Sequence, residues 1–308
     1  MEKNQNGADM REYVIVNLIM AACIALSVFL GFTWIFLLIL IPACMAYVTV
    51  RFSIGQVAGN ILFAILIPSL LTLSLNLTVV IFSLPPGIML GLALKKRYGL
   101  LKTVSFASAG YLICIAAIVI SGLLEQESSF LQAAADAYSQ YRAAFLSTSE
   151  MLGIDAEQSE SMFALLIELL PAMLIFCFGV MGICMFSAVR SVLRRTDADA
   201  VSHYRPLCEM RVDKVSIAVS AVMFLVSLFA GGILGIVVEN LLVLILGYYM
   251  ICGYCLMCYY LRPLSAFVRV PIYLLGLVAM LMMPFVFIVI GLWDAVANFR
   301  GRGKGAVK

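Results

Sequence analysis

Nine long apolar runs divide this sequence, and they constrain the fold more than any other feature. A helix crosses a bilayer core of about 30 Å with roughly 20 apolar residues, and each run is long enough to do so. Only 12% of the residues are charged, whereas a soluble domain carries about 25%. We therefore predict an all-α bundle of about nine transmembrane helices in a cell membrane. The runs are 13–30, 32–50, 54–73, 77–94, 103–124, 161–189, 217–238, 241–261 and 270–293.

Positive charges between the runs predict how the chain is oriented. Lysine and arginine gather between the fourth and fifth runs, between the sixth and seventh, and between the eighth and ninth. Short loops rich in lysine and arginine stay in the cytoplasm, and all three loops fit one topology with a cytoplasmic N-terminus. These residues are Lys95, Lys96, Arg97 and Lys102; Arg190, Arg194, Arg195, Arg205, Arg211 and Lys214; and Arg262 and Arg269.

The C-terminal tail conflicts with that topology. Arg300, Arg302, Lys304 and Lys308 follow the ninth run, so nine crossings would place these basic residues outside the cell. Two explanations are open: either one run is re-entrant and the number of spans is eight, or the tail breaks the rule. A cytoplasmic tail would exclude the nine-span topology.

The runs and loops together predict seven parts of the chain. Within the last group of spans, Glu239-Asn240 interrupts the apolar sequence, and we interpret this pair as an exterior turn. The parts are a cytoplasmic tail at 1–12, five transmembrane helices at 13–124, an exterior segment at 125–160, a sixth span at 161–189, a basic cytoplasmic loop at 190–216, three spans at 217–293 and a basic tail at 294–308.

The exterior segment is acidic and amphipathic. It carries seven acidic residues against Arg142 alone. Its apolar residues recur at intervals of three and four, which is the pattern of a helix with one apolar face. We predict a helix that is either a solvated connector or a lid over an exterior pocket. The apolar positions are Phe130, Ala134, Tyr138, Tyr141 and Phe145.

Three cysteines at a spacing of three, Cys252, Cys255 and Cys258, lie inside the eighth apolar run. Such a triplet could hold a metal or an iron–sulfur cluster, but a cluster site needs a fourth cysteine and a zinc site needs four ligands. The single histidine, His203, belongs to a predicted cytoplasmic loop. We therefore interpret the cysteines as small apolar residues in a helix interface, and we expect no metal and no cofactor.

Glycines recur at four-residue spacing in two runs. Gly55 and Gly59 open the third run, and Gly87 and Gly91 lie in the fourth, just after Pro85-Pro86. Small residues four apart let helix backbones approach each other closely, so we predict helix-packing sites at these positions. Close approach of the backbone to a ligand is the alternative. The two prolines are expected to break or kink the entry to the fourth helix.

Polar residues within apolar runs are the candidates for a binding site, because a charge at the centre of a membrane helix costs roughly 2.5–3.5 kcal/mol. Glu168 is the deepest, and Pro171 frees a backbone carbonyl near it. It could bind a cation or an amine, or it could be an interfacial glutamate. Asn60 and Asn76 are further candidate ligand-binding residues, with hydrogen bonding between helices as the alternative. The charges of Arg51 and Asp294 are predicted to lie at the membrane interface, with pairing to another charge in the bundle as the alternative.

Motifs for hydrolysis or for ATP binding are absent from the sequence. It contains no HExxH zinc motif, no GxSxG serine motif and no glycine-rich phosphate loop with a lysine. We therefore expect that the chain is not an enzyme.

Several strings resemble the YybS-like family of bacterial multi-pass membrane proteins, whose function is unknown. That family is distantly similar to the substrate-binding (S) subunits of energy-coupling-factor vitamin transporters, which have six helices and an exterior pocket. The first six runs are the comparable part, and three further spans depart from that pattern. The strings are VRFSIG at 50–55, LPPGIMLGLALKK at 84–96, ELLP at 168–171, RSVLRR at 190–195 and GLWD at 291–294, with FR at 299–300.

The resemblance implies a small-molecule-binding or uptake subunit that works with a separate energising ATPase and transmembrane partner. The alternative is a scaffold or regulator of a membrane complex, which needs only surfaces for helix packing. The expected partners are the lipid bilayer, such a complex and a small molecule, with no role for nucleic acid.

Overall fold

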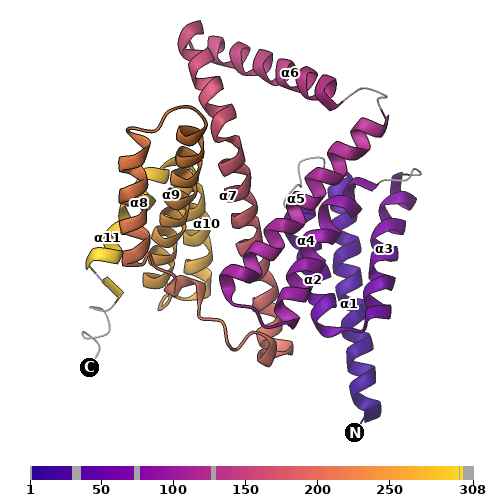
Figure 1. The fold of residues 1–308 in the computed structure, drawn as a ribbon. Coiled ribbons are helices and arrows are strands. Elements are labelled where there is room, and N and C mark those ends of the chain that lie inside the picture. The colour runs from indigo at the N-terminus through magenta and orange to yellow at the C-terminus, as the bar shows by residue number, and fades with distance from the viewer. Residues whose placement is uncertain (1, 30–35, 73–76, 126–129, 298, 301–308) are drawn as a thin grey trace. The chain divides into compact units, whose positions relative to one another are not determined.

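A computed structural model describes residues 2–29, 36–72, 77–125, 130–297 and 299–300 (Figure 1). All long elements in these ranges are helices, which confirms the all-α prediction. A short π-helix, Phe36–Leu40, precedes α2, and 3₁₀ turns lie at Ala198–Ala200 and Leu207–Glu209. The helices are α1 (Glu2–Phe29), α2 (Ile41–Arg51), α3 (Ile54–Thr72), α4 (Leu77–Lys95), α5 (Leu100–Glu125), α6 (Phe130–Met151), α7 (Ala156–Thr196), α8 (Lys214–Ser227), α9 (Gly232–Tyr260), α10 (Ala266–Met282) and α11 (Pro284–Ala297).

The helices form two compact units. Unit 1 comprises Met1–Tyr141 and Cys177–Tyr204, and unit 2 comprises Arg142–Phe176 and Arg205–Lys308. The long helix α7 contributes its second half to unit 1 and its first half to unit 2. Each unit is described by itself below.

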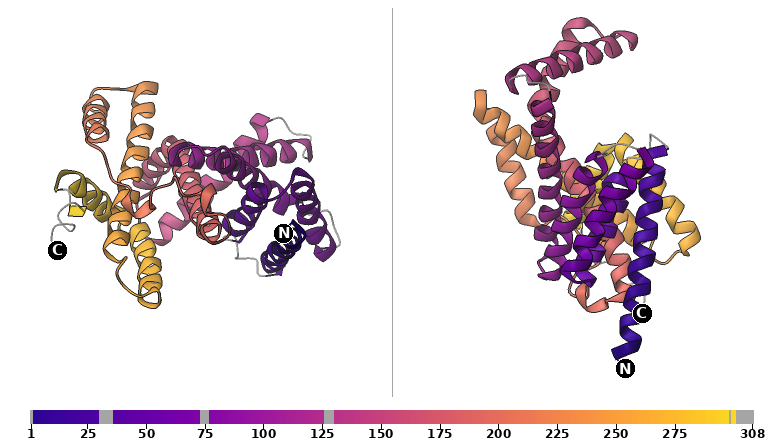
Figure 2. Two further views of the ribbon diagram at one scale, coloured as in Figure 1. Left: turned by 90° about the horizontal axis from the view of Figure 1, so that it is seen from below. Right: turned by 90° about the vertical axis from the view of Figure 1, so that its right-hand side faces the viewer.

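In unit 1, α4 packs between α2 and α5, and α1 runs alongside α3 (Figures 1 and 2). A buried cluster that includes Met20, Ile24, Met45 and Ala64 fills the space between α1, α2 and α3. Of the two effects predicted for Pro85-Pro86, the break is wrong, because both prolines lie inside α4, and the kink stays a prediction. A Cβ atom on Gly110 of α5 would lie 2.4 Å from the Pro86 Cα atom, so α4 and α5 touch through their backbones at this point.

A helix occupies most of the predicted acidic segment. The second half of this helix, α6, folds back onto the start of α7 within unit 2, and Gly153, with a φ of 74°, lies in the turn between them. The rings of Phe145 and Phe163 lie 5.5 Å apart, and Arg142 pairs with Glu160. Of the other predicted apolar positions, Tyr138 and Tyr141 are exposed, and the side chains of Phe130 and Ala134 lie outside the described residues.

The turn between the seventh and eighth predicted spans lies earlier in the chain than expected. The interpretation of Glu239-Asn240 as a turn is wrong, because both residues lie inside α9. The chain reverses between α8 and α9 at 228–231, next to Gly232 with a φ of 62°. Glycine adopts this left-handed conformation without the steric cost that other residues incur. The two polar residues are kept in the helix by the contacts of Asn240 described below.

Among the described residues, five helices are long and apolar enough to cross a membrane, namely α1, α3, α5, α7 and α9. A sixth span is possible if α10 and α11 count as one, but these two helices are bent by 108° at the break between them. The apolar helices Leu38–Arg51 and Lys214–Ser227 are shorter. The predicted number of nine spans, and the orientation of the N-terminus, are therefore not confirmed. A continuous apolar run in the sequence does not require a straight helix, because a chain buried against other helices can bend without meeting water.

Candidate functional site

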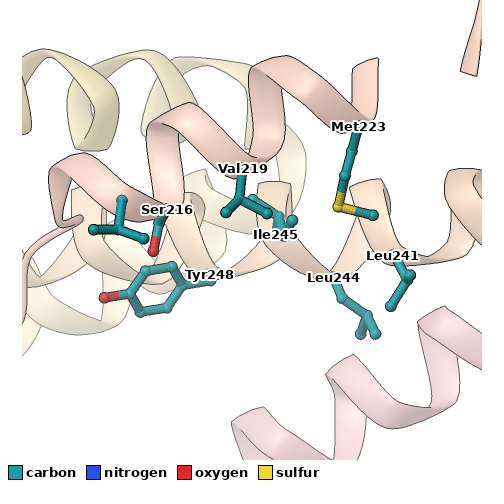
Figure 3. A pocket seen from close by; sticks show the side chains of 8 residues that line it. Ser216, Val219, Met223, Leu241, Leu244, Ile245 and Tyr248 are labelled. Atoms are coloured by element: carbon teal, nitrogen blue, oxygen red, sulfur yellow. The ribbon is translucent and has the colours of Figure 1, made fainter. Parts of the chain in front are cut away.

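An apolar groove runs between α8 and α9 in unit 2 (Figure 3). Its volume is about 460 Å³. Met223 and Leu241 lie towards one end, whereas the hydroxyl groups of Ser216 and Tyr248 lie together towards the other (Figure 3). The groove therefore has an apolar body and a polar end. Its lining consists of Val215, Ser216, Val219, Met223, Leu241, Leu244, Ile245 and Tyr248.

Hydrogen bonds hold the polar end in place. The Tyr248 hydroxyl donates to the Arg211 carbonyl oxygen at 2.9 Å, and the neighbouring Tyr249 hydroxyl donates to the Ser216 carbonyl oxygen at 2.8 Å. Tyr249 also lies 2.8 Å from the Ser220 hydroxyl. These contacts join the start of α8 to the middle of α9, so the two hydroxyl groups at the groove have a defined position.

Asp213 caps the N-terminus of α8 beside the polar end. Its carboxylate accepts hydrogen bonds from the backbone N–H of Ser216, at 3.3 Å, and from the Ser216 hydroxyl. The bond from the Ser216 side chain lowers the pKa of the Asp213 carboxyl below its ordinary value, and the carboxylate is therefore ionised at neutral pH. Arg211 and Lys214, on either side of it in the sequence, are exposed. The polar end thus lies beside one carboxylate that already binds the Ser216 hydroxyl, and two cationic residues neighbour that carboxylate in the sequence.

Unit 2 also holds a buried ion pair, between the end of α11 and the residue Arg300 that follows it. The Arg300 Nε atom lies 3.0 Å from Asp294 Oδ2, and the side chains are 8% and 2% exposed. Arg300 also donates to the carbonyl oxygens of Cys208, at 2.7 Å, and Cys252, at 3.3 Å. Its guanidinium lies 5.7 Å from the centre of the Tyr259 ring. Asp294, predicted as an interfacial charge, is therefore buried against a specific partner.

Two glycines let α9 and α11 touch through their backbones. A Cβ atom on Gly253 would lie 2.0 Å from the Phe287 carbonyl oxygen, and one on Gly291 would lie 2.2 Å from the Tyr249 carbonyl oxygen. The sequence reasoning missed both glycines, because neither has another glycine four positions away in its own helix. It also missed Arg300 as a partner of Asp294. The signal that could have found Arg300 was its position in a tail whose charge contradicted the nine-span topology.

The cysteine triplet lies on α9, where Cys252 and Cys255 are buried and Cys258 is partly buried. All three are free thiols. Within the described ranges, no group of three or more histidine, cysteine or acidic side chains is arranged to hold a metal ion. The Arg300 guanidinium contacts the Cys252 carbonyl oxygen. The contact that the structure shows at the triplet is therefore between the Arg300 side chain and the backbone of α9.

Glu168 has an exposed side chain, and its backbone is bridged to α9. Asn240 places its amide against α7 beside Pro171, which lies inside that helix; its Nδ2 donates to the Glu168 carbonyl oxygen at 2.7 Å and its Oδ1 accepts from the Ala172 N–H at 2.9 Å.

Asn60 lies between α3 and α1 in unit 1. It is fully buried, and its Nδ2 donates to Asn17 Oδ1 at 3.1 Å. Tyr13, one turn before Asn17 on α1, donates its hydroxyl to the Gln56 carbonyl oxygen at 2.9 Å. The structure therefore gives Asn60 a partner on the neighbouring helix. Asn76, the other candidate asparagine, lies outside the described residues.

The four glycines of the predicted packing sites have different surroundings. A Cβ atom on Gly87 would lie 2.5 Å from the Pro42 carbonyl oxygen, and one on Gly91 would lie 2.5 Å from Thr49 Cβ, so both positions face α2 closely. On Gly59 it would lie 3.3 Å from the Tyr13 hydroxyl oxygen. On Gly55 it would meet nothing within 4 Å among the described residues. Close packing is therefore a feature of the pair on α4.

Arg51 joins three segments of unit 1 at the end of α2. Its guanidinium lies 3.3 Å from a carboxylate oxygen of Glu12 on α1 and 3.7 Å from one of Asp197, just after α7. The side chains of the three residues are 24%, 27% and 31% exposed. Arg51 therefore has two acidic partners that are, like it, partly exposed. None of the candidate residues Glu168, Asn60, Arg51 and Asp294 lines the groove.

A protein-family model described as a predicted membrane protein (DUF2232) matches residues 18–295. No curated protein and no solved structure matches the chain.

Proposed function

We propose that this chain, which belongs to the DUF2232 family of predicted membrane proteins, is a small-molecule-binding membrane subunit whose ligand is an amphiphile. The observation that carries the proposal is the groove between α8 and α9, with its apolar body and polar end (Figure 3). A volume of about 460 Å³ lies within the range of about 300–1,000 Å³ that is typical of small-molecule sites.

The chemistry of the lining supports an amphiphile. Burying apolar ligand surface stabilises a complex by roughly 25 cal/mol per Å², and valine, leucine, isoleucine and methionine side chains make up most of the groove. At the polar end, the Tyr248 and Ser216 hydroxyl protons are already donated to Arg211 and Asp213. Their oxygens remain as acceptors, which favours a ligand head group that carries a hydrogen-bond donor. Arg211 and Lys214 disfavour a cationic head group.

A role in uptake is the finer part of the proposal. It rests on the resemblance to S subunits, in which ligand binding and ATP hydrolysis belong to different chains. The first five apolar runs and the second half of the sixth belong to unit 1, whereas the groove lies in unit 2, so the resemblance supports a separate ATPase and not the position of the groove. The sequence holds no phosphate-binding loop, so an energising partner would have to supply the ATPase. A binding subunit of this kind would perform no catalysis.

A scaffold or regulator remains the second candidate function. It is favoured by one observation in unit 1, where Leu62, Leu66 and Leu70 recur every four residues along α3 and are 60%, 57% and 68% exposed. Such a row faces either lipid or the helix of a partner protein. A scaffold would need this surface and no occupied groove.

The test is native mass spectrometry of the full chain extracted gently from its own membrane. We expect a stoichiometric adduct of a few hundred daltons that survives washing. Val219→Trp fills the groove and should remove the adduct, whereas Val222→Trp is a matched control on the same helix. Val222 is 59% exposed and does not line the groove.

An adduct that persists in the Val219→Trp protein would contradict the proposed site. A bare mass together with a co-purifying protein partner would favour the scaffold instead. If that partner were lost in a Leu66→Arg variant, the exposed row of α3 would be the surface that binds it.

A further inference from the structure

The pair α10 and α11 begins and ends beside the same end of α9. The chain leaves α9 at Tyr260 and enters α10 at Ala266, and Arg269 on α10 donates to the Arg262 carbonyl oxygen at 3.2 Å. After α11, the Phe299 carbonyl oxygen accepts a hydrogen bond from the Tyr260 hydroxyl at 3.3 Å. Arg300 then reaches the Cys208 carbonyl oxygen at 2.7 Å. The entry and the exit are therefore close to each other.

The pair extends only part of the way along α9. Near its start, α10 packs by Cys258, whose carbonyl oxygen accepts from the Tyr273 hydroxyl at 3.2 Å. Near its end, Met280 packs in one cluster with Met250 of α9 and Phe287 of α11. Met250 lies about 15 Å from the end of α9, and about 27 Å of α9 extends beyond it, at 1.5 Å per residue. The pair therefore turns back before it has passed a bilayer core of about 30 Å.

Two backbone N–H groups at the bend find partners within the chain, as a turn inside a membrane requires of its backbone groups. The Met283 N–H donates to the Ala279 carbonyl oxygen at 2.8 Å, and the Val286 N–H donates to the Met283 carbonyl oxygen at 3.1 Å. Pro284 starts α11, where a proline has no N–H to leave unpaired. After the bend of 108°, α11 crosses α9 at the Gly253 and Gly291 contact.

The ion pair of Asp294 and Arg300 fastens the exit of α11. The distance between Arg300 Nε and Asp294 Oδ2 is 3.0 Å, and the same guanidinium binds the carbonyl oxygens of Cys208 and Cys252. One arginine thus ties α11 to α9 and to the segment before α8. Because Arg300 neutralises it, the Asp294 carboxylate can lie on the buried side of α11.

We infer that α10 and α11 form a re-entrant hairpin that enters and leaves the membrane on the same side, with its exit fastened by Asp294 and Arg300. Arg205, Arg211, Arg262, Arg269 and Arg300 then share that side with the C-terminal tail. Loops of this composition are cytoplasmic, so the hairpin removes the conflict between the basic tail and the other basic loops. The inference does not depend on the proposed ligand.

Reporter fusions after Lys308 of the full chain test the side of the tail in a bacterial host. Green fluorescent protein matures in the cytoplasm, and alkaline phosphatase is active only outside it. We expect the fluorescent fusion to be active and the phosphatase fusion to be inactive. An active phosphatase fusion with a dark fluorescent fusion would overturn the hairpin.

Epitope tags inserted in the full chain give a second measurement that compares the two ends of the pair directly. One tag follows Leu264, at the entry of the hairpin, and one follows Gly231, across the candidate span α9. In intact and permeabilised spheroplasts, a tag after Lys308 should share its accessibility with the tag at Leu264. If it instead shares the accessibility of the tag at Gly231, the pair crosses the membrane and the inference is wrong.

Discussion

Unit 1 and unit 2 each hold an arginine against acidic side chains, and they bury it to different degrees. Arg51 in unit 1 is 24% exposed and lies 3.3 Å from Glu12 and 3.7 Å from Asp197. Arg300 in unit 2 is 8% exposed and lies 3.0 Å from Asp294, which is 2% exposed. A charge removed from water needs its partner far more than one that water still reaches. We therefore expect the stability of unit 2 to depend strongly on its ion pair, and the stability of unit 1 to depend only weakly on its own.

Two glycine contacts, one in each unit, also differ. On Gly59 in unit 1, a Cβ atom would meet the hydroxyl at the tip of Tyr13, at 3.3 Å. On Gly253 in unit 2, it would meet a backbone carbonyl oxygen at 2.0 Å. A side-chain tip can move aside, but the backbone of α11 cannot move without shifting the helix. Gly87 and Gly110 of unit 1 also meet backbone atoms, so the difference belongs to these two contacts and not to the whole units. The comparison predicts that Arg300→Ala and Gly253→Ala cost more than Asn60→Ala and Arg51→Ala, and these four variants test it.

Arg300→Ala should have the largest effect. It leaves the Asp294 carboxylate buried without a counter-charge, which destabilises a protein by roughly 3–5 kcal/mol. Thermal unfolding of the full chain in mild detergent measures the loss. The double variant Asp294→Leu with Arg300→Met removes both charges and should recover most of the stability. Equal losses in the single and the double variant would show that the pair is not what holds α11.

Gly253→Ala should be the next most costly. The new methyl group would overlap the Phe287 carbonyl oxygen, and overpacking of this kind costs about 1–3 kcal/mol. The same unfolding measurement on Gly59→Ala is the control, because the Tyr13 side chain can give way and alanine is the better helix former. Similar losses of stability in both variants would contradict the difference between these two glycine contacts.

Asn60→Ala should have an intermediate effect in unit 1. It removes the hydrogen bond to Asn17, and such bonds between membrane helices contribute about 0.6 kcal/mol, with values up to about 1.7 kcal/mol. The double variant Asn17→Ala with Asn60→Ala should cost little more than either single change. A loss as large as that of Arg300→Ala would mean that unit 1 also depends on one polar contact.

Arg51→Ala should have the smallest effect. Water reaches its ion pairs, so the expected loss is at most about 1 kcal/mol and should shrink as salt is added. Arg51→Lys, which keeps the charge, is the matched control. A loss of stability that does not change with salt would mean that the Arg51 ion pairs behave like the buried pair of unit 2. The difference between the two units would then be wrong.

Much of the helical framework was predictable from the sequence. The runs at 54–73, 77–94 and 103–124 correspond to α3 (Ile54–Thr72), α4 (Leu77–Lys95) and α5 (Leu100–Glu125) within three residues at each end. Length and polarity suffice there, because polar residues end each run on both sides. The same reasoning found Glu168, Asn60, Arg51 and Asp294 as notable polar positions, but it could not assign their partners.

The candidate site was not predictable in the same way. The groove joins residues of α8 with residues of α9, and its polar end depends on bonds from Tyr248 to Arg211 and from Tyr249 to Ser216. Each of these side chains is ordinary in its own run. Their alignment follows from the turn at 228–231, and the sequence reasoning placed that turn at Glu239-Asn240.

The sequence by itself determined that this is a helical membrane protein, because so many apolar residues in long runs can be buried only in helices within lipid. Only the tertiary structure decided where the chain turns and which charges meet. Asn240 bridges its amide to the backbone of α7 around Pro171, and Arg300 binds the carbonyl oxygens of Cys208 and Cys252. Both outcomes depend on contacts between residues far apart in the chain, which no local pattern of polarity encodes.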